Sequence, residues 1–364
     1  MILRQLQIEN FKCFQKQQTF DFGKITLLTG ANSSGKSSVI HAVLGTLQSG
    51  EYPATYSPNG SYVNMGDFKE VVYNHNEDLT IKISFEYEKS GTIRTINTEW
   101  KQDEVSKLFI NNEFKFAKIS LNESDETLKT SVQSDFQDYS LGVNYIGAFR
   151  LDPQRTYLEK NRKEERIKKD GEGYLEQIIA WETQKSPRFE QLISEMKELS
   201  LLENIRSKRL GGGIYEFKIQ TNVSGQFSSL SDVGYGISQF LPIMVADLQL
   251  PDNSQLFLSQ PEIHLHPSVQ SSFGDYLVRQ INKSDKRYVV ETHSEYLLNK
   301  LRLAIVKGEL KQEDISVYYL ENNGVDTSVH KIQFEKNGQI NGAPSSFFET
   351  YMADSMEIVL NATD

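Results

Sequence analysis

The sequence predicts an α/β protein, in which a mixed or parallel central sheet carries an antiparallel β layer and a helical insert. Strand and helix patterns alternate from about residue 215 to residue 306, which favours a parallel sheet covered by helices. Polar and apolar residues alternate strictly over residues 80–87, as in a half-buried antiparallel strand. A glycine-rich loop at residues 30–37, placed between an apolar strand and an apolar-faced helix, completes the α/β pattern.

The composition is that of a protein with a sizeable core. Of 364 residues, 38% are hydrophobic and 24% are charged, close to the average for folded domains. No apolar run approaches the roughly 20 residues of a membrane-spanning helix. The first residues alternate in polarity and lack the apolar centre of a signal peptide. We therefore expect a cytoplasmic protein without membrane contact. The single cysteine, Cys13, excludes internal disulfides and is expected in the core.

The net charge of −10 opposes overall attraction to nucleic acid. One stretch could still form a local basic face, and its residues are Lys160, Arg162, Lys163, Arg166, Lys168 and Lys169. Three glutamates at positions 159, 164 and 165 interleave with them. A solvated helix with ion pairs between residues i and i+4 is therefore favoured over a DNA-binding surface.

The first 150 residues favour strands, interrupted by one helix. The helix is expected at residues 36–47, where four apolar residues share one helical face. Residues 79–145 resemble an antiparallel sheet, with turns at Ser90-Gly91 and Asn111-Asn112. Three further strands are expected at residues 3–14, 18–22 and 24–29.

The remaining residues favour helices and an α/β alternation. Residues 152–209 are charged and helical in pattern, and Pro187 divides them into at least two helices. Three glycines at positions 211–213 are expected to form a flexible joint. Two Asn-Gly pairs, at residues 323–324 and 337–338, predict hairpins in the tail. Between joint and tail we expect strands at residues 215–220, 255–258 and 287–292, and helices at residues 235–248, 269–282 and 294–306.

Residues 30–37 fit the pattern G-x-x-x-x-G-K-[ST] of a phosphate-binding loop, or P-loop. Glycines let the backbone fold around an anion with its N–H groups pointing inward, and the following helix N-terminus adds partial positive charge. Lys36 is expected to bridge the outer phosphates of ATP, and the Ser37 hydroxyl to ligate Mg²⁺. The expected nucleotide ligands are Gly30, Asn32, Ser33, Ser34, Gly35, Lys36, Ser37 and Ser38.

Further segments, read with this loop, resemble the ABC/SMC-type heads of bacterial OLD-like AAA-family ATPases. Residues 6–14, LQIENFKCF, are similar to the first strand of such heads, and residues 231–242, SDVGYGISQFLP, to their signature segment. Residues 260–267, QPEIHLHP, resemble the run after the Walker B strand, and residues 291–294, ETHS, the segment that carries the switch histidine. The resemblance implies a P-loop NTPase fold of the ABC/SMC-head type, with ATP and Mg²⁺ as cofactors.

The resemblance also implies a division of the chain into four parts. Residues 145–150 and the tail are similar to one branch of the group, which carries a short extra C-terminal domain. The parts are an N-terminal ATPase lobe with the P-loop and the antiparallel sheet (1–150), a helical insert (151–210), a C-terminal ATPase lobe with signature, Walker B strand and switch histidine (211–320), and a short hairpin and helix extension (321–364).

In such heads, ATP on one P-loop is capped by the signature segment of a second head, which implies a homodimer or a higher oligomer. The capping groups here would be Ser231, Gly234, Gly236 and Ser238, whose hydroxyl and N–H groups at a helix start suit a γ-phosphate. His293 would sense that phosphate. Taken alone, the same stretch would be an ordinary helix N-terminus. His264 and His266 resemble a metal pair, but only Glu262 joins them, and the family pattern accounts for both histidines.

The sequence departs from the family pattern where hydrolysis needs acid. The Walker B strand, residues 256–258, should lead into a Mg²⁺-binding acid and a carboxylate that orients water, but Ser259 and Gln260 follow it. Losing one such group lowers turnover by about 10²- to 10³-fold. Three interpretations stay open: ATP is hydrolysed very slowly, Glu262 supplies the charge, or Ser259 is an engineered substitution. The candidate catalytic residues are Gln260, Glu262 and His293.

Three functions follow from these patterns. The first is an ATP-driven dimerising switch with weak hydrolysis, which controls a separate effector protein such as a nuclease or toxin; phage defence enters by analogy with relatives. The second is an ATPase acting on DNA like an SMC or repair head, which the acidic charge and the short insert disfavour. The third is a scaffold whose nucleotide is structural. No motif for other chemistry accompanies the P-loop, and this favours the first function.

Overall fold

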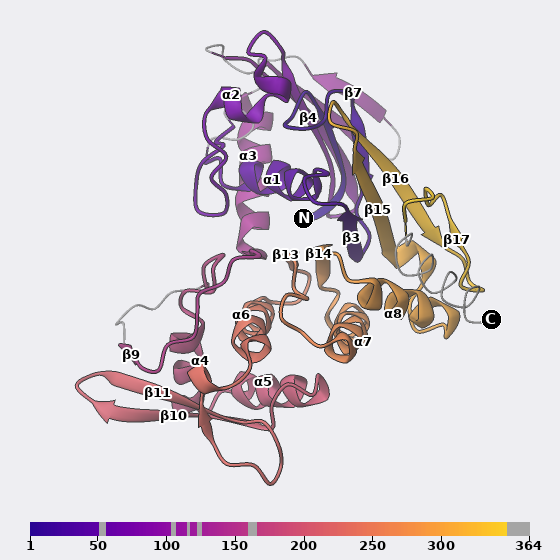
Figure 1. The fold of residues 1–364 in the computed structure, drawn as a ribbon. Coiled ribbons are helices and arrows are strands. Elements are labelled where there is room, and N and C mark those ends of the chain that lie inside the picture. Colours follow the sequence, from indigo (N-terminus) through magenta and orange to yellow (C-terminus); the bar gives the residue numbers. More distant parts are fainter. Residues whose placement is uncertain (51–55, 103–106, 115–116, 122–125, 159–165, 348–364) are drawn as a thin grey trace, which may run out of the picture.

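The structure, a computed structural model, describes residues 1–50, 56–102, 107–114, 117–121, 126–158 and 166–347. Its central sheet mixes parallel and antiparallel pairs in the order β17-β16-β15-β3-β14-β13-β8 (Figure 1). This confirms the predicted α/β fold with a mixed central sheet. The strands of this sheet are β3 (Ile25–Gly30), β8 (Val143–Ile146), β13 (Gln255–Ser259), β14 (Arg287–Glu291), β15 (Ile315–Asn322), β16 (Thr327–Phe334) and β17 (Ile340–Asn341).

Strand β3 is buried along its whole length because helices or sheets cover both faces of the central sheet. Leu27 of β3 belongs to the core beneath α6, α7 and α8, whereas Leu28 belongs to the core beneath α1 and the antiparallel sheet (Figure 1). The alternating side chains of one strand thus join two cores. The helices concerned are α1 (Lys36–Leu47), α6 (Tyr235–Gln249), α7 (Pro267–Ser284) and α8 (Glu295–Val306).

The parallel strands end at a common edge of the sheet. Strand β14 pairs in parallel with β3 on one side and with β13 on the other. Glu291, the last residue of β14, lies opposite Leu28 of β3 and opposite Ser259 of β13. The chain leaves this edge from β3 into the loop of residues 30–35. Ligands of open α/β sheets bind outside such carboxyl ends.

The antiparallel layer has the order β2-β1-β4-β5-β6-β7, and its β4–β5 hairpin turns at the predicted Ser90-Gly91 pair. Two predictions for this layer are wrong. Asn111-Asn112 lies within β6, where pairing with β5 outweighs the turn preference of asparagine. A helix, α3, occupies residues that we expected in strands. The elements are β1 (Ile2–Glu9), β2 (Gln18–Asp21), β4 (Ile81–Lys89), β5 (Thr92–Trp100), β6 (Lys107–Phe114), β7 (Ala117–Leu121), α3 (Glu126–Leu141), α2 (Phe68–Val71) and η1 (Tyr73–His75).

The insert contains strands as well as helices. Helices α4 (Tyr174–Thr183) and α5 (Pro187–Glu198) confirm the break at Pro187, which occupies the first turn of α5. The prediction of helix beyond them is wrong, because β10 (Asn204–Gly211) pairs with β11 (Ile214–Gln220). The glycines at 211–213, all at positive φ, form the tip of this hairpin and not a joint. Short pieces complete the region: β9 (Tyr157–Leu158), β12 (Ser228–Ser229) and η2 (Leu230–Asp232).

The tail continues the central sheet. The first Asn-Gly pair joins β15 to β16 and the second joins β16 to β17, so both predicted hairpins are confirmed. Strand β15, which follows η3 (Gln312–Asp314), pairs in parallel with β3. Residues 348–364 of the predicted C-terminal extension lie outside the described residues. None of the described helices has the length and apolar character needed to cross a bilayer.

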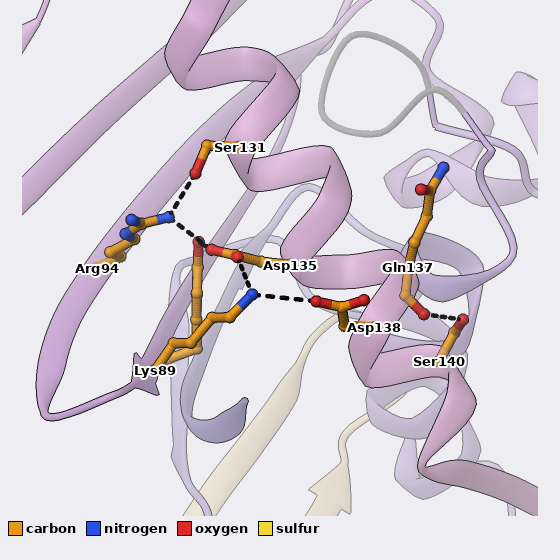
Figure 2. A network of polar contacts seen from close by, with 8 residues as sticks. Lys89, Arg94, Ser131, Asp135, Gln137, Asp138 and Ser140 are labelled. Atoms are coloured by element: carbon orange, nitrogen blue, oxygen red, sulfur yellow. Dashed lines mark hydrogen bonds and ion pairs between the residues drawn. The ribbon is translucent and has the colours of Figure 1, made fainter.

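Helix α3 is anchored to the antiparallel sheet by a buried carboxylate. Asp135 on α3 accepts hydrogen bonds from Tyr87 Oη at 2.8 Å, Lys89 Nζ at 2.5 Å and Arg94 Nη1 at 2.6 Å (Figure 2). Lys89 also pairs with Asp138, one turn further along the helix, whose side chain is 61% exposed. One helix therefore offers a buried and an exposed partner to the same lysine.

We predict that Asp135→Ala lowers the free energy of unfolding by about 1–3 kcal/mol, because it removes the acceptor of the buried Tyr87 hydroxyl and leaves Lys89 and Arg94 with only Asp138 and Ser131 as partners. Asp138→Ala is the matched control and should change that free energy by less than about 1 kcal/mol, since exposed ion pairs contribute little. Urea unfolding followed by circular dichroism measures both. Equal effects of the two variants would contradict the anchoring role of Asp135.

Candidate nucleotide-binding site

The loop between β3 and α1 can only be built with glycine at two positions. A Cβ atom at Gly30, which has φ +134°, would lie 2.1 Å from the carbonyl oxygen of Leu320. A Cβ atom at Gly35, which has φ +100°, would lie 2.5 Å from Cys13 Sγ. Gly35 also occupies the N-cap position of α1, where no side chain of the described residues caps the helix. The uncapped N–H groups and the helix dipole are therefore available to an anion.

A cavity of about 930 Å³ opens against this loop. It is lined by residues 32–38 and by three further basic side chains, Lys12, His41 and Lys169. The sequence pattern predicted none of them at this site, and it placed Lys169 in the basic stretch that favours a solvated helix. The size lies within the range of small-molecule sites. The clustering of Lys12, His41 and Lys169 with Lys36 suits a polyanion. Lys12 and His41 could have been suspected, since one follows the first strand and the other lies on the helix of the P-loop.

Lys36 closes its own loop. Its Nζ donates to the carbonyl oxygens of Gly30 at 3.0 Å and Ala31 at 2.7 Å, and its side chain is nearly buried. Burial lowers the pKa of Lys36, while the charges of Glu291 and Glu262 oppose this shift. The ammonium is held by neutral carbonyls, so a phosphate oxygen would be a stronger partner for it.

Glu291 at the end of β14 faces the P-loop and is a site residue that the sequence pattern did not predict. Ser37 Oγ donates to Glu291 Oε1 at 2.8 Å, and Ser259 Oγ donates to Glu291 Oε2 at 2.9 Å. Tyr145 Oη lies 3.3 Å from Ser259 Oγ. Ser37, Ser259 and Tyr145 all line the cavity, and Glu291 is only 5% exposed. The one available signal was an acidic residue at the end of a buried strand.

The three candidate catalytic residues do not share one surface. Gln260 lines the cavity, and its carbonyl accepts from Arg150 Nη2 at 2.9 Å. Glu262 does not line the cavity; its Oε1 accepts from the backbone N–H of His293 at 2.6 Å. Burial raises the pKa of Glu262, against the opposing effect of its hydrogen bonds and of Arg150. Partial burial and the charge of Lys36 lower the pKa of His293, which favours a neutral imidazole at pH 7.

The signature segment lies away from the cavity of its own chain, since none of residues 231–238 lines it. Gly234 is exposed at the N-cap of α6, and Ser231 is partly exposed. The backbone of Gly236 packs on the loop after β13, where a Cβ atom would lie 2.8 Å from the His264 carbonyl oxygen. The hydroxyl of Ser238 is buried and donates to the Tyr235 carbonyl at 3.0 Å.

The remaining motifs have local partners. His266 Nδ1 accepts from the Ser268 N–H at 3.3 Å and caps α7, while the His264 ring lies 5.5 Å from the Tyr235 ring. Residues 159–165 of the basic stretch lie outside the described residues. Within the described part, Arg166 donates to the Val143 carbonyl at 2.6 Å and Lys168 pairs with Glu172. These bonds favour a structural role for both side chains.

The donor set fits a nucleoside triphosphate with Mg²⁺. The loop has the glycines, the uncapped helix start and the lysine that phosphates require. The hydroxyl of Ser34 is buried without a partner among the described residues, as expected of a group that awaits a ligand. The Ser37 hydroxyl and the Glu291 carboxylate are oxygen groups of the kind that Mg²⁺ prefers.

Comparison with known proteins agrees with this geometry. A family model described as AAA ATPase domain matches residues 1–298. The chain belongs to the AAA ATPase domain family. No curated protein matches this AAA ATPase at a significant level. Family membership supports ATP binding and, in general, the use of Mg²⁺.

Solved structures with a similar fold are heads of SMC proteins. The SMC head domain from Thermotoga maritima superposes with a TM-score of 0.54 at 12% identity, covering 92% of this AAA ATPase and 100% of the head. An SMC head bound to the C-winged helix domain of ScpA gives 0.54 at 14% identity, covering 92% and 99%. An SMC head from Pyrococcus furiosus, bound to the C-terminal domain of ScpA, gives 0.52 at 11% identity and covers both chains fully. These similarities confirm the SMC-head type of fold.

We predict that Lys36→Ala weakens ATP binding roughly 10- to 100-fold, because a charge-assisted bond to phosphate is lost. Fluorescence titration with a labelled ATP analogue measures the Kd. Lys24→Ala is the control, since Lys24 lies outside the cavity lining and pairs with Asp285 and Asp314. Unchanged affinity in Lys36→Ala would contradict the assignment of the loop.

His41 in the cavity wall should also affect how the free energy of unfolding depends on pH. Burial, Lys12 and Lys169 lower the pKa of His41 to about 4, and His41 Nδ1 lies 3.2 Å from Lys12 Nζ. The folded-state pKa lies below the unfolded value of about 6.5. The stability contributed by neutral His41 is therefore fully present above that value and is lost as the pH falls toward 4.

Between pH 7 and pH 5, the wild type should lose about 2 kcal/mol more unfolding free energy than His41→Gln. Urea unfolding at both pH values tests this. His75→Gln serves as the control because His75 is exposed. A loss as large in His41→Gln as in the wild type would refute the buried, neutral state of His41.

Proposed function

We propose that this AAA ATPase is an ATP-dependent dimerising switch of the OLD-like branch. ATP on the P-loop of one copy is capped by the signature segment of a second copy, and this closure controls a separate effector protein, a nuclease or toxin in an anti-phage system. Hydrolysis is slow, because Ser259 and Gln260 replace the two expected carboxylates. ATP binding, more than turnover, is then the signal.

The observation that carries this proposal is the separation of the two half-sites. The P-loop lines a cavity to which residues 231–238 of the same chain contribute nothing. The start of α6, where Gly234 is exposed and no described side chain caps the helix, is a second anion-binding feature on the same molecule. Two copies related by a two-fold axis can bring each helix start to the other P-loop, because such an interface is the same patch on both subunits.

A chain of direct contacts runs between the half-sites and suits a switch. The start of α6 packs on the His264 carbonyl through Gly236. Two residues before His264, Glu262 holds the backbone N–H of His293. His293 follows β14, whose last residue, Glu291, bonds to Ser37 of the P-loop. A change at the phosphates can thus shift the loop against which the signature helix rests.

A protein partner is favoured over DNA. In two of the solved structures of similar fold, the SMC head is bound to a domain of ScpA. By analogy we expect a protein on the head of this ATPase. The net charge of −10 and the internal bonds of Arg166 and Lys168 oppose a DNA-binding surface.

The dimer can be tested at a single glycine. With ATP and Mg²⁺, light scattering should show the wild-type mass doubling from 41.6 kDa. Gly234→Asp should remain monomeric, since its carboxylate occupies the helix N-terminus that would cap the γ-phosphate and repels that phosphate. It should also fold well, because aspartate is a favoured N-cap residue and a Cβ atom at Gly234 meets no atom of the described part of the chain within 4 Å.

Gly234→Ala is the matched control and should dimerise at no more than about tenfold higher protein concentration. ATP affinity of the monomer should be the same in both variants. A wild type that stays at 41.6 kDa with saturating ATP, or a Gly234→Asp variant that dimerises like the wild type, would contradict the composite site.

A further inference from the structure

We propose that Glu291, at the end of β14, supplies the Mg²⁺-binding carboxylate that is missing from position 259 of β13. An acid at the end of β14 thus takes the role that the family pattern gives to an acid at the end of β13. This inference rests on ATP binding at the P-loop, which is part of the proposed function, but not on dimerisation. It also replaces the interpretation that Glu262 provides the missing charge.

The register of the sheet makes such an exchange possible. Glu291 and Ser259 are direct partners in the parallel β13–β14 ladder, so their side chains leave the same edge of the sheet. The longer glutamate side chain spans the gap and accepts from Ser37 Oγ at 2.8 Å. Its second oxygen accepts from Ser259 Oγ at 2.9 Å, so the serine orients the carboxylate instead of binding a cation itself.

Glu262, the alternative carboxylate, does not line the cavity. It bonds instead to the backbone N–H of His293. Glu291 lines the cavity together with Ser37, the hydroxyl that a P-loop uses for Mg²⁺. One carboxylate and one hydroxyl from the protein are sufficient beside the phosphates of the nucleotide, since Mg²⁺ keeps several waters and takes few protein ligands.

Electrostatics predicts that removing the charge of Glu291 changes ATP affinity in opposite directions without and with a divalent cation. A triphosphate in the loop lies close to a carboxylate that is only 5% exposed, and two buried negative groups repel each other. A divalent cation between them converts this repulsion into attraction. Removing the charge of Glu291 should therefore help ATP binding without metal and hinder it with metal.

The test is a titration of a fluorescent ATP analogue into the full chain, once in EDTA and once over a series of Mg²⁺ concentrations. Relative to the wild type, Glu291→Gln should bind the analogue at least about tenfold more tightly in EDTA. It should also need at least about tenfold more Mg²⁺ for half-maximal enhancement. Glutamine keeps the shape and one acceptor oxygen, and thermal unfolding without nucleotide checks that the variant is folded.

Asp170→Asn is the charge-matched control, because it also removes one carboxylate from the cavity lining; it should keep the wild-type Mg²⁺ requirement. Glu262→Gln is the competing variant. The proposal is overturned if Glu291→Gln keeps the Mg²⁺ requirement of the wild type, or if Glu262→Gln alone loses it. It is also overturned, whatever the variants do, if Mg²⁺ fails to tighten ATP binding to the wild type. A wild type that binds no ATP in either condition would overturn the proposed function as well.

Discussion

The parallel pairing of β14 between β3 and β13 determines what can lie beside the phosphate loop. Because the three strands run in the same direction, their last residues reach one edge, and the loop with its two obligatory glycines starts there. The buried carboxylate of Glu291 is held at this edge by hydroxyls from two different segments, Ser37 and Ser259. Helix α1 begins at this edge and supplies Ser37, so strand ends and helix start meet at one place.

The same arrangement explains how a head that lacks acid at position 259 can retain a plausible cation site. In a parallel ladder, adjacent strand ends are near neighbours. A glutamate, which is longer than an aspartate by one methylene, can therefore reach from the end of β14 to Ser37. An acid on either strand can then serve the same P-loop serine. The second missing carboxylate is supplied neither by Gln260, which faces the cavity without a charge, nor by Glu262, which turns toward the backbone of His293. Binding of nucleotide and slow turnover are thus compatible with one structure.

The sequence contained enough to predict the fold and half of the site. The P-loop has a local pattern with a physical reason for each position, and the alternation of strands and helices gives the sheet type. The strand order is not local: nothing in the sequence near Glu291 says that β14 lies between β3 and β13. Without that order, Glu291 is merely a residue two positions before the predicted switch histidine, His293. The position of the carboxylate therefore emerged only from the structure.

The errors elsewhere have a similar cause. Asn111-Asn112 favours a turn by itself, but cross-strand pairing with β5 carries the chain straight through it. Residues 204–209 were included in the predicted helical insert because charged residues dominate them, but they form β10, which is mostly exposed and pairs with β11. The helix α3 was missed because its mixed surface gives only a weak helical periodicity over residues 126–141. Local preference decided these segments less than tertiary pairing did.

The most direct test of the account is the position of a bound cation. Crystals grown with ATP and Mn²⁺, measured at the manganese absorption edge, would show the metal as an anomalous peak. We predict one peak in contact with the Ser37 hydroxyl and the Glu291 carboxylate, beside the phosphates. A peak held by Glu262 or by the histidines at 264 and 266, or ordered ATP with no metal near Glu291, would contradict the central claim.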